Sequence, residues 1–280
     1  MKAIPRTVRS LLGASLFFGL GVVGSANELS EAEAGELSDA EAAKLAQKSQ
    51  NPIGDLISLP LQNNFFFSED GGDLTWNLNI QPVIPISLND DWNLITRTIA
   101  PVFAMEKAVP GFDSAGLGDI NFTGFFSPKD DSGFIWGAGP IVSLPTATSD
   151  IFGSGKWSAG PSFVGLWIDG PWVAGGLINN LWSFAGEGDR DEVNAMLIQP
   201  FVNYNFDGGW YATFAPIMTA DWTAASSERW TIPLGGGFGR VFKVGEQPVN
   251  TSLQAYYNVE RPTGGPEWSI RFQVQLLFPK

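Results

Sequence analysis

The chain has 280 residues, of which 29 are acidic, 16 basic and 11 tryptophan, and it contains no histidine and no cysteine. Without cysteine it forms no disulfides, and without histidine it lacks the usual general base of serine hydrolases and the commonest transition-metal ligand. The net charge of −13 makes nucleic acid a poor partner. Catalysis would have to rest on carboxylates, Lys or Tyr. We predict no catalytic residues, no enzymatic activity, no cofactor and no metal site.

The first 26 residues have the layout of a secretory signal peptide. Lys2, Arg6 and Arg9 precede a short apolar run, and small residues follow at Gly24 and Ala26. The shortness of the run and its glycine content favour a cleaved signal peptide over the alternative, a retained membrane anchor. Without this leader, 13 basic residues remain against 29 acidic ones, a net charge of −16 for the exported chain.

Residues 27–50 form an acidic lead followed by a short helix. Ser38 and Glu41 match a capping box, and Lys44 and Lys48 lie near the end of the helical pattern, where the helix dipole favours cations. This predicts a helix over about 39–48. The helix either enters the mouth of the domain that follows or lies beside it, or the whole stretch is a solvated spacer.

From Leu56 onward the hydrophobic pattern has a period of 2. The stretch Leu74–Leu88 alternates apolar and polar residues along its whole length, which indicates a strand with one face of each kind. About twelve such runs follow one another, and short turns such as 89–91 and 207–209 alternate with mostly longer loops. We predict an all-β fold for residues 51–280, an antiparallel up-and-down β-barrel of about 12 strands.

Three features favour a transmembrane barrel over a soluble barrel or sandwich. The polar faces consist of Asn, Gln, Ser and Thr, and the charges gather in the turns. The tryptophans lie near strand ends, as indole prefers the lipid headgroup level. Same-face pairs such as Trp157 and Trp167 are ten residues apart, and ten to twelve residues climb roughly 25–30 Å in a tilted strand. The two predicted interface girdles are Trp76, Trp157, Trp182, Trp222, Trp230 and Trp268 at the long-loop end, and Trp92, Trp136, Trp167, Trp172 and Trp210 at the short-turn end.

Prolines recur inside the predicted strands, where a closed barrel has no free edge for them. They are Pro82, Pro85, Pro101, Pro140, Pro161, Pro200, Pro216 and Pro233. Because each removes a ladder donor, we predict bulges or lumen water near them, and ladders that run fully paired through Pro82 and Pro140 would contradict this.

Several segments resemble one family. The stretches 45–67, "LAQKSQNPIGDLISLPLQNNFFF", 81–102, "QPVIPISLNDDWNLITRTIAPV", and 136–148, "WGAGPIVSLPTAT", are similar to the bacterial outer-membrane family named for the MetA pathway of phenol degradation, often mislabelled neuromedin U. The resemblance covers about residues 43–280. It implies an outer-membrane barrel that passes small molecules, aromatic or hydrophobic ones among them. The chain departs from the usual terminal Phe of such barrels, since it ends in Phe278-Pro279-Lys280.

The lumen is the expected functional site, because twelve strands should leave a narrow interior that can pass or bind one small molecule. The predicted candidates for the solute path are Arg97, Arg271, Asp119, Glu260, Asn79, Gln199, Asn203, Gln254 and Gln273. The four charged residues either set a transverse field that orients a solute or brace the barrel as a paired network. The acidic loops 68–73 and 185–192 either hold Ca²⁺ and bridge to lipopolysaccharide, or are simply solvated.

The sequence thus predicts an outer-membrane channel for passive or substrate-selective uptake of small molecules in a Gram-negative bacterium. Its expected partners are outer-membrane lipid and lipopolysaccharide, the barrel-assembly machinery and a small-molecule solute. One alternative is a structural or adhesive barrel with a closed interior. Another is a membrane-embedded lipid-modifying enzyme, which the missing histidine disfavours.

Overall fold

The computed structural model describes residues 37–68, 74–106, 113–129 and 133–279, which belong to one compact unit. Predictions that concern residues 1–36 and most of the loop 68–73 lie outside the described residues. Within the described ranges, no helix has the length and hydropathy to span a bilayer. The elements are α1 (Asp39–Gln50), β1 (Ile57–Phe67), β2 (Leu74–Ile80), β3 (Val83–Ser87), β4 (Trp92–Met105), β5 (Ala115–Leu117), β6 (Ile120–Pro128), β7 (Phe134–Leu144), β8 (Lys156–Asp169), β9 (Trp172–Gly186), β10 (Asn194–Asn205), the 3-10 turn η1 (Asp207–Gly209), β11 (Trp210–Phe214), β12 (Met218–Asp221), β13 (Trp230–Val244), β14 (Gln247–Glu260) and β15 (Trp268–Phe278).

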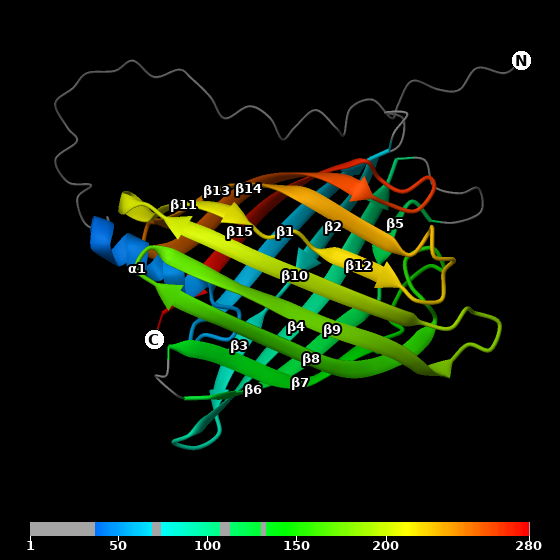
Figure 1. Cartoon of the computed structure of the whole chain (residues 1–280), viewed down its shortest axis with the longest axis horizontal. Helices are drawn as coiled ribbons and strands as arrows, with labels where there is room; N and C mark the ends of the chain where they lie inside the picture. The colour runs from blue at the N-terminus through cyan, green and yellow to red at the C-terminus, as the bar shows by residue number, and fades with distance from the viewer. Residues whose placement is uncertain (1–36, 69–73, 107–112, 130–132, 280) are drawn as a thin grey trace, which may run out of the picture. The chain divides into compact units, whose positions relative to one another are not determined.

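The strand segments form a single antiparallel sheet that closes on itself (Figure 1). The first and last strands meet in a continuous ladder, from Ile57 opposite Phe278 to Phe67 opposite Trp268. Three barrel strands are each split into two segments, namely β2 with β3, β5 with β6, and β11 with β12. The described chain is therefore a closed up-and-down barrel of twelve strands, and this prediction is confirmed.

Prolines lie at most of the irregularities. Pro82 separates β2 from β3, because a residue without an N–H cannot continue the ladder. Pro216 lies in the gap between β11 and β12, opposite the part of β10 that contains Pro200. Pro233 adjoins a register shift between β13 and β14. At these four prolines the ladders are broken or shifted, so the condition that would contradict the prediction is not met there.

Pro140 and Pro161 behave differently, because they lie opposite each other in a β7–β8 ladder that runs on without a shift. The interruptions lie in the two flanking ladders of these described strands, between Thr123 and Phe126 on β6 and between Ala159 and Ser162 on β8. The positions without an N–H donor, at Pro140 and Pro161, therefore face the neighbouring strands β6 and β9 and not each other. The β7–β8 ladder itself is unbroken, and the irregularities predicted near these prolines lie in the two ladders that flank it.

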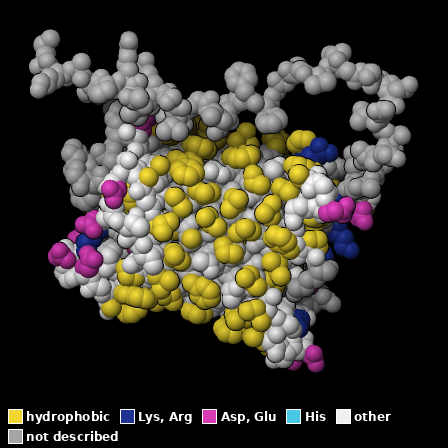
Figure 2. Space-filling view, turned by 180° about the vertical axis from the view of Figure 1, so that it is seen from behind, with side chains coloured by type: hydrophobic (Ala, Val, Ile, Leu, Met, Phe, Trp, Pro, Cys, Tyr) yellow, Lys and Arg dark blue, Asp and Glu magenta, His cyan; other side chains and the backbone are white. Residues whose placement is uncertain are grey.

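The two faces of the wall differ in chemistry, as the alternation predicts. Adjacent residues of β8 show it clearly, since Ser162 is 3% exposed and Phe163 is 43% exposed. Hydrophobic side chains are spread over the outer surface, and charged side chains gather toward its ends (Figure 2). Inward-facing amides such as Gln62, Asn64 and Asn77 are buried. The burial of polar groups inside and the exposure of large apolar groups outside is the reverse of a soluble barrel.

Helix α1 lies at the short-turn end of the barrel (Figure 1). Its capping box forms as predicted, with Ser38 Oγ accepting from the Glu41 N–H and the Glu41 carboxylate accepting from the Ser38 N–H. Gln47 Nε2 donates to the carbonyl of Gly170, which belongs to one short turn. The helix buries Ala42, Leu45 and Ala46 toward the barrel and so enters its mouth, one of the arrangements left open by the sequence.

The interior at this end is apolar, whereas the sequence predicted a polar lumen. Ile53, in the segment after α1, packs among buried inward-facing residues of β4, β6, β8, β9 and β10, namely Ile95, Phe125, Val164, Leu166, Val173, Leu177 and Phe201. On the other side Leu45, Ala46 and Leu56 pack with Tyr211, Val241 and Leu277. We call residues 39–56 the floor segment, because they seal these two clusters across the end of the lumen.

Candidate functional site

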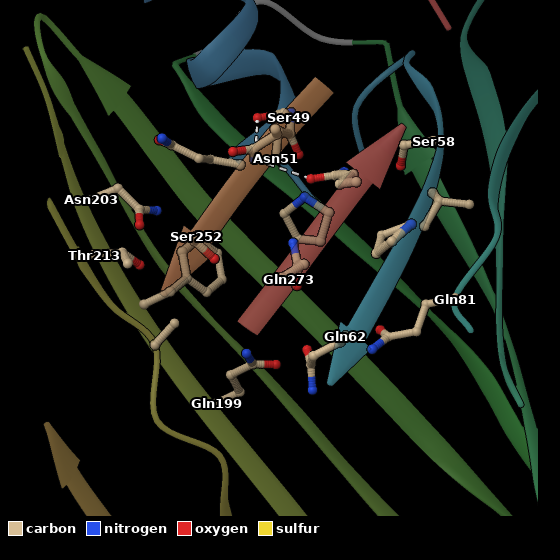
Figure 3. Close-up of a pocket in the computed structure, with 18 of the residues that line it drawn as sticks. Ser49, Asn51, Ser58, Gln62, Gln81, Gln199, Asn203, Thr213, Ser252 and Gln273 are labelled. Atoms are coloured by element: carbon tan, nitrogen blue, oxygen red, sulfur yellow. Dashed lines mark hydrogen bonds between the residues drawn. The ribbon is translucent and has the colours of Figure 1, made fainter. Parts of the chain in front are cut away.

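A polar cavity of about 180 Å³ lies inside the barrel above the floor segment. Its lining comes from the last turn of α1, from residues 51–56 and from strands β1, β3, β4, β9, β10, β11, β14 and β15. Side chains from widely separated strands face this common space, among them Gln62, Gln199 and Gln273 (Figure 3). Because the period of 2 sends alternate residues inward, one amide or hydroxyl from each of many strands reaches the same space.

Six of the nine predicted solute-path residues line this cavity. They are Arg97, Gln199, Asn203, Gln254, Arg271 and Gln273. Asn79 is half-buried on β2, opposite Gln62 of β1, but it is not part of the lining. Asp119 and Glu260 lie elsewhere. Of the four charged residues predicted to set a transverse field, the two arginines therefore line the cavity and the two carboxylates do not.

Arg271 of β15 is held by neutral groups. Its Nε donates to Asn64 Oδ1 at 3.2 Å and its Nη1 donates to the carbonyl of Ala215 at 3.0 Å. The guanidinium also lies over the ring of Tyr256, 5.1 Å from the centroid. Residue 215 can offer its carbonyl inward because the strand is interrupted there, between β11 and β12. The side chain is thus fixed from three sides without a carboxylate among these contacts.

Arg97 of β4 uses a similar device. Its Nη2 donates to Gln81 Oε1 at 2.6 Å. Gln81 is buried at the gap between β2 and β3, and its own N–H donates to the carbonyl of Pro60. The gap that Pro82 creates therefore also positions the partner of this arginine.

The floor segment is joined to the wall by hydrogen bonds as well as by apolar contacts. Gln50 and Asn205 exchange two side-chain hydrogen bonds of 2.9 and 3.1 Å. Asn250 Nδ2 donates to Ser49 Oγ, and Asn250 Oδ1 accepts from the hydroxyl of Tyr211. Ser49, Gln50 and Asn250 line the cavity but are not among the predicted solute-path residues. The signal for Ser49 and Gln50 was a polar helix end directly before the first strand, and the signal for Asn250 was its place on the same face of β14 as Gln254.

Asp119 lies at the other end of the barrel and fastens the loop between β7 and β8. Its carboxylate accepts from the N–H groups of Ala147 and Ser154 and from Ser154 Oγ, at 2.7–3.2 Å. Phe152 of the same loop is buried and stacks on Phe103 of β4, with ring centroids 5.6 Å apart. The loop 145–155 therefore folds inward over the long-loop end of the lumen.

Glu260 is exposed at the end of β14, beside the register shift that moves it out of step with β13. In the acidic loop 185–192, Arg190 donates to the carbonyls of Asp150 and Gly153. Glu192 forms an ion pair with Lys156, with 3.2 Å between Glu192 Oε1 and Lys156 Nζ. Hydrogen bonds from Ser183 and Lys156 lower the pKa of the Glu192 carboxyl below its ordinary value of 4.5. No group of three or more potential metal ligands comes together among the described residues.

The eleven tryptophans lie on the outer side of the strand ends. Eight of the side chains are 36–57% exposed, namely Trp92, Trp157, Trp167, Trp172, Trp182, Trp210, Trp222 and Trp268. Trp76, Trp136 and Trp230 are less exposed and contact other side chains: Trp76 donates to Asn63, and edge-to-face ring pairs join Trp136 to Trp92 and Trp230 to Trp222. Aromatic side chains thus gather near both ends of the barrel.

No family model matches the sequence, and no curated protein matches it either, so the family resemblance remains a prediction. Among solved structures the barrel is similar to an outer membrane channel from Pseudomonas putida F1, with a TM-score of 0.60 at 14% identity, covering 80% of this chain and 94% of that one. Other matches are the β domain of the Bordetella autotransporter BrkA (TM-score 0.44, 13% identity, 80% and 99% covered) and the CymD monoaromatic hydrocarbon channel (0.43, 10%, 86% and 91%). At these identities the likeness shows the barrel fold alone.

Proposed function

We propose that the protein is a channel of the Gram-negative outer membrane through which small molecules pass passively. The observation that carries this proposal is the polar cavity inside a closed barrel whose outer face is apolar. A solute that leaves water for this interior finds amide and hydroxyl partners in place of its hydration shell. The resemblance to the MetA-pathway family and the likeness to an outer membrane channel support the same role.

In this proposed channel the floor segment acts as a gate. It closes the short-turn end by apolar contacts around Ile53 and Leu45 and by the amide pair Gln50–Asn205. A solute bound in the cavity therefore leaves toward that end only when the floor segment moves. Such a motion breaks contacts of a short element and leaves the twelve-stranded ladder intact.

The surroundings follow from the same proposal. Residues 1–26 act as a cleaved export signal, and the barrel-assembly machinery inserts the chain. The exposed tryptophans lie at the two headgroup levels, next to lipid on one side of the membrane and lipopolysaccharide on the other. Short turns and α1 then face the periplasm, and the long loops face outward.

Liposome swelling tests this function. Full-length protein reconstituted into liposomes should admit small solutes and produce swelling above that of protein-free liposomes. Absence of swelling with correctly folded protein, and also with a variant whose floor segment is displaced, would favour the closed structural barrel. Release of fatty acid from the same liposomes would favour the lipid-modifying alternative.

A further inference from the structure

The charges of the cavity have one sign. Its lining contains three cationic side chains, Lys48 from α1, Arg97 from β4 and Arg271 from β15. Among the described residues, no Asp or Glu belongs to the lining. This is unexpected in a chain with 29 acidic residues and 16 basic ones. The positive charge is therefore placed specifically in the lumen of an otherwise acidic protein.

The partners of the two arginines leave this charge uncompensated. Arg97 donates to an amide oxygen, and Arg271 donates to an amide oxygen and a backbone carbonyl. Neutral oxygens satisfy donors but do not cancel a full charge. A buried cation without a counter-ion is costly in a protein interior, and an anion that enters supplies what the protein does not.

The guanidinium groups also keep donors for such an anion. The contacts of Arg271 use Nε and Nη1, and Nη2 carries two further N–H groups. Arg97 uses Nη2 toward Gln81, so donors on Nη1 and Nε remain beyond that contact. Because their partners already fix both side chains, little rotamer entropy is lost when a carboxylate binds.

The rest of the lining suits an organic body better than a bare inorganic ion. Val83, Leu177, Phe201 and Ala215 line the same cavity as the arginines. Leu177 and Phe201 belong to the apolar cluster around Ile53, so they form a firm apolar surface next to the polar groups. A volume of about 180 Å³ accommodates one small molecule.

From these observations we propose that the cavity is a binding site for a small organic carboxylate, whose anionic head group lies between Arg97 and Arg271 and whose apolar body lies on Leu177 and Phe201. This site rests on the proposed function, because it makes the cavity the selective station of the channel. The competing role for the arginines is to brace the wall without binding an anion.

Isothermal titration of the wild-type protein in a nonionic detergent at pH 7.5 tests the site without any variant. The probes are hexanoate, hexanamide and hexylamine, which share one apolar body and differ in charge. Hexanoate should bind at least ~10-fold more tightly than hexanamide, as expected for one charge-assisted contact, and hexylamine should not bind. Equal affinity of hexanoate and hexanamide would overturn the proposal.

Substitutions then assign the head-group contacts. Arg97→Gln and Arg271→Gln should each weaken hexanoate binding roughly 10-fold and leave hexanamide unchanged, because each removes one charged partner. Arg240→Gln is the matched control, since Arg240 lies exposed on the outer face over Trp210. Heat-modifiable gel migration shows whether each variant remains a folded barrel.

Phosphate as a fourth probe separates a general anion site from an organic one. Binding of phosphate as tight as that of hexanoate would contradict the role given to Leu177 and Phe201. The two proposals also fail separately. Hexanoate binding without liposome swelling, by the wild type and by the variant with a displaced floor segment, would refute the channel and keep the site. Swelling without a preference for hexanoate would refute the site and keep the channel.

Discussion

Among single residues, Asp119 accepts hydrogen bonds through its carboxylate from the loop between β7 and β8, although it was predicted to lie on the solute path. The alternation of the sequence predicted that Asp119 faces inward, as Arg97 does, so both were expected in the same lumen. In the structure the register changes by one residue between β5 and β6, and Asp119 lies at that change. Its oxygens therefore point to the backbone of 147–154.

Asp119→Ala should release the loop 145–155 from the long-loop end of the lumen. Three hydrogen bonds to a carboxylate are lost, and we expect local opening to become easier by about 2 kcal/mol, roughly 30-fold. Limited proteolysis of the folded barrel in detergent measures this as faster cleavage within the loop. Asp150→Ala removes a carboxylate from the same loop and keeps these bonds, so its cleavage rate should match the wild type. Equal rates for both variants would show that Asp119 does not hold the loop.

The residue scale also shows what alternation can and cannot predict. Gln199, Asn203 and Gln254 line the cavity, and their inward orientation follows from the sequence because a period of 2 fixes the face of every residue in a regular strand. Asp119 and Glu260 both lie next to register changes, where the pattern no longer fixes the neighbours. Ser49 and Gln50 belong to a helix whose docking site depends on tertiary contacts that no local pattern encodes.

At the scale of elements, a glycine before a proline recurs in two neighbouring strands, Gly139-Pro140 in β7 and Gly160-Pro161 in β8. At both glycines a neighbouring backbone comes very close. A Cβ added at Gly139 would lie 1.8 Å from the carbonyl oxygen of Gly124, and one at Gly160 would lie 1.8 Å from that of Asn180. The interrupted ladders at the prolines thus coincide with places where strands approach too closely for any side chain.

Gly139→Ala should therefore destabilise the barrel, because backbone atoms cannot move aside as a flexible side chain can. We expect a loss of about 1–3 kcal/mol, the usual cost of overpacking. Urea unfolding in detergent, followed by tryptophan fluorescence, measures the change. Gly176→Ala is the control, since the nearest atom to its added Cβ is 3.7 Å away. If both substitutions cost the same, the close approach at Gly139 has no energetic role.

At the scale of the whole molecule, the barrel follows almost entirely from the sequence. Twelve runs with a period of 2, short turns at one end and tryptophans near strand ends are local features, and they were sufficient for the strand number and the closed topology. The closed short-turn end was not predictable in the same way. Ile95, Phe125, Val164 and Val173 occupy ordinary inward positions, and no local pattern shows that Ile53 of the floor segment packs among them.

Single-channel conductance in a planar bilayer measures whether the floor segment closes the polar lumen and can move away from it. Ala46 is fully buried between α1 and the wall, so Ala46→Asp places an unpaired carboxylate there and should displace the helix. Ala40→Asp changes an exposed position of the same helix and serves as the control. We predict a severalfold larger conductance for Ala46→Asp than for the wild type and for Ala40→Asp. Equal conductance of all three folded proteins, or none in any of them, would contradict the account.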